Sequence, residues 1–199
     1  MTAIPYFSAQ RIGDTLSCAF KGIMRLPSDY FAAMPPAHDY RGSMVLLSIY
    51  LAVPALMASL FTGLISIFII LPVSLLFGIV GTWFWAWYLS WAARRFCSST
   101  LSTTDAFQIC AYSSAPLIFS WIPILGMLAW MWNLYLNWQG LISHARLGGG
   151  SALLIIFGAF VVMGLSFAVL GALLVYYSFH FDWQTLPLPP QLANPLTYL

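Results

Sequence analysis

The stretch QICAYSSAPLIFSWIPILG, residues 108–126, has no charged residue, yet it contains adjacent serines and two prolines, Pro116 and Pro123. It lies inside an uncharged run from residue 106 to residue 145. That run is long enough for two membrane-spanning helices, because each needs about 20 apolar residues. A tight turn at residues 121–123 would make the two helices an antiparallel hairpin. The stretch therefore predicts a helical hairpin inside a membrane.

The composition of the whole chain agrees with a membrane protein. Of the 199 residues, 61% are hydrophobic and 6% are charged, whereas about 25% of the residues in a soluble domain are charged. Seven Lys and Arg residues against five Asp residues give a net charge of +2, which is too weak and too scattered for a nucleic-acid surface. The three cysteines lack the spacing of metal ligands. We expect an all-α polytopic membrane protein without nucleic acid, metal or cofactor.

The apolar runs predict a five-helix transmembrane bundle. Its segments are expected near residues 43–61, 65–91, 105–122, 124–143 and 151–178. The domain organisation then has three parts: a cytoplasmic segment at 1–42, the five-span domain at 43–178, and a Pro-rich tail at 179–199 on the other side. The last run is long for one helix but short for two, which together with a turn need about 40 residues.

The basic residues predict the orientation of the chain. With five crossings, every Lys and Arg falls on one side of the membrane, as the positive-inside rule requires. These residues are Arg11, Lys21, Arg25, Arg41, Arg94, Arg95 and Arg146. The N-terminus is expected in the cytoplasm and the C-terminus in the periplasm. The first residues lack a basic segment followed by an apolar one, so we expect no cleaved signal peptide.

Residues 11–25 predict an amphipathic helix before the first crossing. Arg11, Asp14, Thr15, Lys21 and Arg25 fall on one face, and Ile12, Leu16, Ala19, Phe20 and Ile23 fall on the other. Such a helix is typical of one that lies on the membrane, with its apolar face in the interface. The alternative is that it packs against other parts of its own chain.

The hairpin at 105–143 has polar residues at helical spacing on both of its helices. They are Asp105, Gln108, Tyr112 and Ser113 on the first, followed by Pro116, which frees backbone groups, and Asn133, Asn137 and His144 on the second. Antiparallel pairing would bring Asn137 level with Tyr112, and His144 level with Asp105. Polar groups inside a membrane point toward protein. We expect an interhelical polar network that holds the bundle together, and a path for a substrate is the alternative.

Two further surfaces follow from helical spacing. Trp83, Trp87 and Trp91 repeat every four residues just before Arg94, which is typical of an aromatic belt at the membrane interface. A site for a flat hydrophobic ligand is the alternative interpretation. In the last predicted helix, small residues that favour close helix packing form a second surface. They are Gly158, Gly164, Ala168 and Gly171.

The chain resembles the Yip-domain family, the Ypt/Rab-interacting multi-pass membrane proteins, from about Pro27 to the last crossing. The resemblance rests on PSDYFAAMPP at 27–36 and on a set of positions in the hairpin. These are Ala111, Tyr112, Pro116, Pro123, Gly126, Trp132, Leu136 and Gly140. It implies a five-helix bundle with a cytoplasmic N-terminus, and it is closer to the bacterial branch. Eukaryotic members act as adaptors for small GTPases, but their long N-terminal region is missing here, so GTPase binding is not expected.

We expect a non-enzymatic scaffold or accessory subunit of a bacterial inner membrane. Its partners would be membrane lipids together with another membrane protein or further copies of itself. A small transporter or channel component for a lipid or small solute is the alternative. The sequence predicts no catalytic residues, because no nucleophile, base and orienting group occur together. The polar residues of the hairpin thus predict a structural role before a chemical one.

Overall fold

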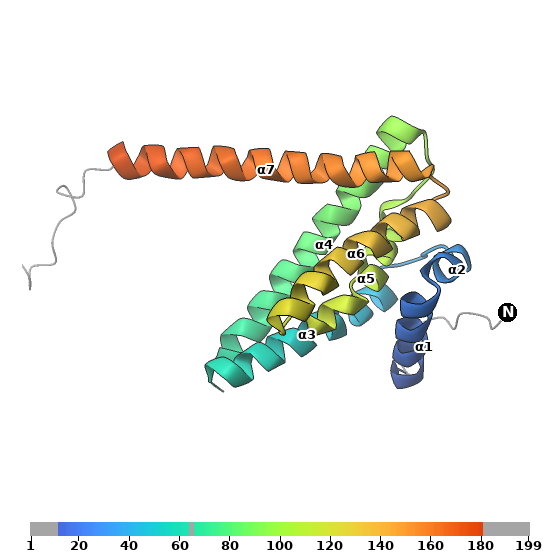
Figure 1. Cartoon of the computed structure of the whole chain (residues 1–199), viewed down its shortest axis with the longest axis horizontal. Helices are drawn as coiled ribbons and strands as arrows, with labels where there is room; N and C mark the ends of the chain where they lie inside the picture. The colour runs from blue at the N-terminus through green and yellow to red at the C-terminus, as the bar shows by residue number, and fades with distance from the viewer. Residues whose placement is uncertain (1–11, 64–65, 181–199) are drawn as a thin grey trace, which may run out of the picture. The chain divides into compact units, whose positions relative to one another are not determined.

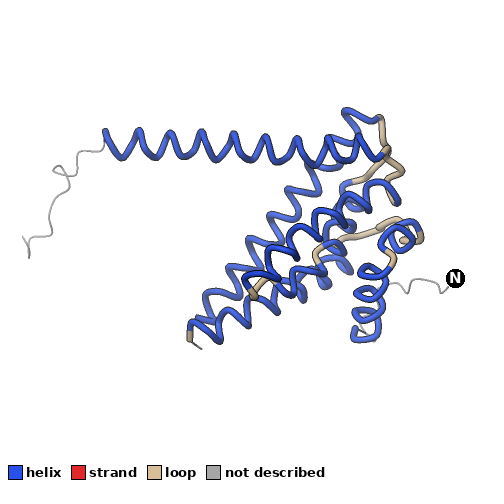
Figure 2. The backbone as a smooth tube through the Cα atoms, viewed as in Figure 1, coloured by secondary structure: helices blue, strands red, loops and turns tan. Residues whose placement is uncertain are grey.

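The computed structural model describes residues 12–63 and 66–180, and every regular element in these ranges is a helix (Figures 1 and 2). The elements in chain order are α1 (Ile12–Arg25), α2 (Pro27–Ala32), α3 (Arg41–Thr62), α4 (Ile67–Cys97), α5 (Thr103–Ser113), the 3₁₀ helix η3 (Ala115–Phe119), α6 (Pro123–Ser143) and α7 (Gly149–His180). The prediction of an all-α chain is confirmed for this part of the protein. Of the predicted tail at 179–199, residues 181–199 fall outside the described residues, and the first two belong to α7.

The chain divides into two compact units, residues 1–157 and 158–199. The first contains α1 to α6 and the first turns of α7. The second contains the remainder of α7, in which nearly every described residue is exposed. The four small residues predicted to favour helix packing all lie in the second unit. A Cβ atom added at Gly164 or Gly171 would meet nothing within 4 Å.

In the first unit, α3 and α4 form an antiparallel hairpin (Figure 1). Gly63 ends α3 with φ at 108°, a backbone conformation that glycine adopts more readily than other residues. The short helix α5 returns from the end of α4 and packs against α3, α4 and α6. The hydroxyl groups of Ser90 on α4 and Thr103 on α5 form a hydrogen bond of 3.1 Å.

The core of the first unit surrounds α5. Seven of its eleven residues are buried, including Phe107, Ile109 and Ala111 with no exposed surface. Large side chains from the neighbouring helices complete the core, among them Tyr50 of α3, Leu89 of α4, and Leu136 and Leu141 of α6. The polar hairpin is therefore held at the centre of the unit, while α4 and α6 keep exposed apolar faces.

The structure divides the predicted third crossing into two helices. Residues 105–122 were expected as one bent helix, but α5 ends at Ser113 and η3 follows it. Pro116 has no N–H to donate, and the next amides bond three residues back, from Leu117 to Ser114 and from Ser120 to Leu117. Pro54 and Pro72, in contrast, lie inside helices that continue past them.

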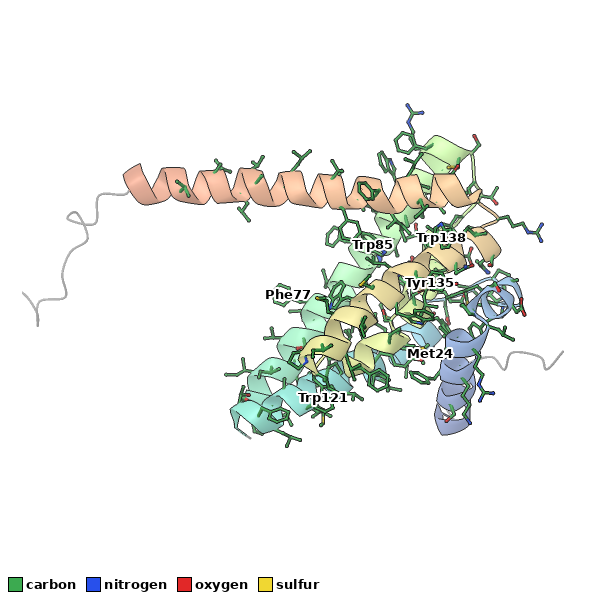
Figure 3. The ribbon with its side chains drawn as sticks, in the orientation of Figure 1. Met24, Phe77, Trp85, Trp121, Tyr135 and Trp138 are labelled. Atoms are coloured by element: carbon green, nitrogen blue, oxygen red, sulfur yellow. The ribbon has the colours of Figure 1, made fainter. Side chains whose placement is uncertain are left out.

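The predicted amphipathic helix coincides with α1, and its position on a membrane stays a prediction. A helix forms at α1, but Ala19 and Ile23 are buried in the core of the protein. Phe20 packs on Phe119 of η3, with ring centroids 6.4 Å apart. Met24 also lies against the core (Figure 3). These four side chains thus contact other parts of the same chain, as the alternative interpretation predicted. The side chains of Ile12 and Leu16 fall outside the described set.

Within residues 12–63 and 66–180, three helices are long and apolar enough to cross a membrane by length and composition. They are α3, α4 and the part of α7 from Gly149 to Leu173. Each coincides with a predicted crossing. The other two predicted crossings correspond to α5 with η3 and to α6, so the count of five remains a prediction.

Candidate functional site: the polar α5–α6 hairpin

Asp105 joins three segments of the chain at the start of α5. Its Oδ2 accepts a hydrogen bond from Ser102 Oγ at 2.6 Å, and Ser102 Oγ accepts one from the Asp105 backbone N–H at 3.0 Å. This reciprocal pair is a capping arrangement that satisfies free groups at a helix start. Asp105 Oδ1 accepts a bond from the Ala37 backbone N–H at 2.7 Å. The carboxylate thus ties the linker between α2 and α3 to the N-terminus of α5.

His144, at the end of α6, lies close to the same Asp105 carboxylate. Its Nε2 is 3.8 Å from Asp105 Oδ1, and both side chains are largely buried, with 12% and 18% of their surface exposed. The structure therefore brings Asp105 and His144 together, at the positions that antiparallel pairing predicts. Asp105 is the point where α5, α6 and the N-terminal linker meet.

Asn133 makes the bond that crosses the hairpin at its other end. Its Nδ2 donates to the Ser113 carbonyl at 2.9 Å, and that carbonyl belongs to the last residue of α5. The last carbonyls of a helix have no partner within the helix, so Asn133 supplies one. Asn137 instead donates within α6, to the Asn133 carbonyl at 2.9 Å and to Asn133 Oδ1 at 3.3 Å.

Gly140 sets the close approach between the two helices. A Cβ atom added there would collide with Cγ2 of Ile109, a fully buried residue of α5. The pairs 105 with 144, 109 with 140, and 113 with 133 lie along one antiparallel interface. Small residues at such positions allow helix backbones to approach each other in membrane proteins.

Several buried polar atoms have no hydrogen-bond partner within the described part of the chain. They are Tyr50 Oη, Gln108 Oε1, Ser113 Oγ and Asn137 Oδ1. Among the residues described, the side-chain oxygens of Gln108 and Asn137 therefore do not make the hydrogen bonds that the predicted network requires. Tyr112 packs on Tyr30 of α2, with ring centroids 5.9 Å apart. Pro116 is buried at the start of η3.

Some contacts of this region were not predicted from the sequence. Ser102 could have been found, since Ser-x-x-Asp before an apolar run is a recognised helix start. The Ala37 amide and the Tyr30 ring come from distant segments, and no local pattern marks them. The same holds for two links to the start of α7: Trp138 Nε1 donates to the Gly149 carbonyl at 3.0 Å, and Tyr88 Oη to the Ile155 carbonyl at 3.2 Å (Figure 3).

The predicted aromatic belt lies on the surface of α4. Trp83, Trp87 and Trp91 are all exposed. Trp85 is half-buried on another face of the helix. Trp91 packs edge-on against Phe96, with ring centroids 5.9 Å apart, beside Arg94 and Arg95. This arrangement suits contact with lipid at a membrane interface.

The polar groups of the hairpin serve mainly to position backbone. Asp105 and Asn133 both bond to main-chain groups. Among the residues that the structure describes, no group of three His, Cys, Asp or Glu side chains could hold a metal ion. The arrangement is that of a multi-pass helical membrane protein whose centre is a polar hairpin.

The comparison with protein families identifies this class. Residues 21–171 match the Yip1 domain, so the chain belongs to the Yip1-domain family. The match begins within α1 and ends within α7, and it includes the whole polar hairpin. The family predicted from the sequence is confirmed. Neither the curated proteins nor the solved structures give a match.

Proposed function

We propose that this chain is a non-enzymatic scaffold or accessory subunit of a bacterial inner membrane. The observation that carries the proposal is the use of the polar residues. Asp105 holds a backbone group of the linker between α2 and α3, and Asn133 holds one at the end of α5, which builds a rigid centre. Meanwhile α4 and α6 present exposed apolar and aromatic side chains, which suit lipids, another membrane protein or a further copy of this chain.

The proposal includes five crossings, with the N-terminus in the cytoplasm and the C-terminus in the periplasm. The eleven residues of α5 rise about 16 Å and η3 adds about 10 Å, close to the hydrocarbon thickness of about 30 Å. Arg41, Arg94, Arg95 and Arg146 lie at helix ends that the two hairpins bring to one side. The positive-inside rule favours the cytoplasm for that side.

The topology predicts that the two ends of the chain lie in different compartments. A fluorescent reporter that folds only in the cytoplasm should be active when fused before residue 1 and inactive when fused after residue 199. A reporter that needs the periplasm should behave in the opposite way. Activity of the same reporter at both ends would contradict an odd number of crossings.

The scaffold proposal predicts a stable partner. After purification in native lipid, intact-complex mass spectrometry should show the chain with another membrane protein or with a second copy at a fixed ratio. The partner should be lost when Trp130 and Met131, both exposed on α6, are changed to Ala, or when the same change is made at Phe68 and Ile69 on α4. A lone chain in native lipid would contradict the proposal.

A small transporter or channel component for a lipid or small solute is the second candidate. It is favoured by α5, a short helix that ends among buried residues, because broken helices form the binding sites of many transporters. In the same measurement, one bound solute or lipid per chain with no protein partner would favour this candidate over the scaffold.

A further inference from the structure

The end of α5 is a helix terminus enclosed by protein. All residues from Ala106 to Pro116 are buried except Gln108, which is half-buried. In the proposed topology of five crossings, α5 rises about 16 Å from its charged end, which places its last residue about halfway through a hydrocarbon core of about 30 Å. Irregular backbone at that depth is tolerated where protein or water satisfies its polar groups.

Most polar groups at this end have a partner. The Cys110 carbonyl accepts bonds from the Ser114 backbone N–H at 3.1 Å and from Ser114 Oγ at 2.8 Å. The Ser113 carbonyl accepts the bond from Asn133 Nδ2. Asn133 Oδ1 accepts the bond from Asn137 Nδ2. The backbone side of the helix end is therefore well satisfied.

Two side-chain oxygens next to these bonds have none. Ser113 Oγ and Asn137 Oδ1 lack a partner, and their residues are 0% and 2% exposed. Ser113 accepts a bond from the Asn133 carboxamide through its backbone carbonyl, and Asn137 donates one to it through Nδ2, so both residues adjoin the same carboxamide. One is a hydroxyl that can donate, and the other is a carbonyl oxygen that accepts.

A buried hydroxyl or carboxamide without a partner costs free energy, and native proteins satisfy such groups with ordered water. We propose that the end of α5 is a site for bound water, which accepts a hydrogen bond from Ser113 Oγ and donates one to Asn137 Oδ1. This inference does not rest on the scaffold role, because a transporter with the same hairpin would hold the same site.

The chemistry of the site favours water over a cation. The nearest acidic residue along the hairpin is Asp105, about two turns away on α5, and it is already bonded to Ser102 and Ala37. A cation at the end of α5 would have only neutral oxygens around it, and a buried charge without a counter-charge is strongly disfavoured. A neutral molecule with two donors and two acceptors fits the site.

The first test uses Ser113→Ala with Ser114→Ala as a matched control. If water bridges the two oxygens, Ser113→Ala breaks the bridge, and we expect the melting temperature in detergent to fall by about 2–4 °C. If the site is dry, the same change removes a hydroxyl that has no partner, and the melting temperature should stay equal or rise. The latter result overturns the proposal. Ser114→Ala removes one direct hydrogen bond to the Cys110 carbonyl. It therefore shows how far the melting temperature falls when a serine loses a direct bond.

The second test detects the water and separates it from a cation. In lipid nanodiscs, solid-state NMR transfer from water protons should reach the Ser113 and Asn137 signals of the wild type and weaken at Asn137 in Ser113→Ala. The melting temperature should be the same in sodium chloride, potassium chloride and choline chloride. The absence of water transfer at both residues overturns the proposal. A melting temperature that rises in sodium or potassium chloride, and no longer does so in Ser113→Ala, would mean that a cation occupies the site in place of water, and this result also overturns the proposal.

Discussion

Replacement of Asp105 by alanine is expected to lower the free energy of unfolding by about 2–4 kcal/mol, because it removes two hydrogen bonds to a carboxylate. The Ala37 backbone N–H would lose its acceptor, Ser102 Oγ would lose its Oδ2 partner, and His144 would lose the nearby carboxylate. The change would therefore release the linker between α2 and α3 as well as the start of α5.

Asp105→Asn separates geometry from charge at this position. Its Oδ1 can still accept the Ala37 bond, so we expect a smaller loss of about 1–2 kcal/mol. Asp29→Ala is the control, since Asp29 is exposed at the start of α2; its loss should be within about 0.5 kcal/mol. Denaturant unfolding in detergent measures all three variants. If Asp105→Ala and Asp29→Ala unfold at the same denaturant concentration, Asp105 does not join the segments.

The hairpin could be predicted from the sequence because its signals are local. The apolar runs on either side of residues 121–123 give two antiparallel helices, and antiparallel pairing places His144 opposite Asp105. The structure places His144 Nε2 3.8 Å from Asp105 Oδ1. Helical periodicity and the position of one turn were enough to predict the register of α5 against α6.

The end of α5 could not be predicted in the same way. Pro54, Pro72 and Pro116 all follow apolar residues, yet helices continue through the first two and stop before the third. At the third, Asn133 of another helix satisfies the Ser113 carbonyl. Sequence spacing placed Asn133 on the correct face of α6, but not at a particular carbonyl of α5.

The position of α1 was ambiguous for a related reason. An amphipathic helix offers the same apolar face to lipid and to protein, so periodicity does not decide between them. The groups that α1 contacts lie on other elements: a Cβ atom added at Gly22 would lie 2.6 Å from Cδ2 of Tyr30, on α2. Phe119, which meets Phe20, is farther still along the chain.

Replacement of Gly126 by alanine is expected to destabilise the protein by about 1–3 kcal/mol, as overpacking of a tight core does. A Cβ atom at this position would lie 2.7 Å from the Ser120 backbone carbonyl oxygen. Unlike a flexible side chain, that oxygen cannot rotate away, because it belongs to the turn that joins η3 to α6. The Gly126 backbone N–H also bonds the Ile122 carbonyl at 2.6 Å, which fixes the first turn of α6.

Gly81→Ala is the matched control for this prediction. Gly81 is exposed within α4, and an added Cβ atom would meet nothing within 4 Å; because alanine favours helix, this change should be neutral or stabilise by up to about 1 kcal/mol. Thermal melting in the same detergent compares the two variants with the wild type, and opposite shifts are expected. Equal melting temperatures for Gly126→Ala and the wild type would mean that the turn can widen freely. In that case the register of Asp105 with His144 would have to be held by the polar contacts alone, and Asp105→Ala should then separate α6 from α5.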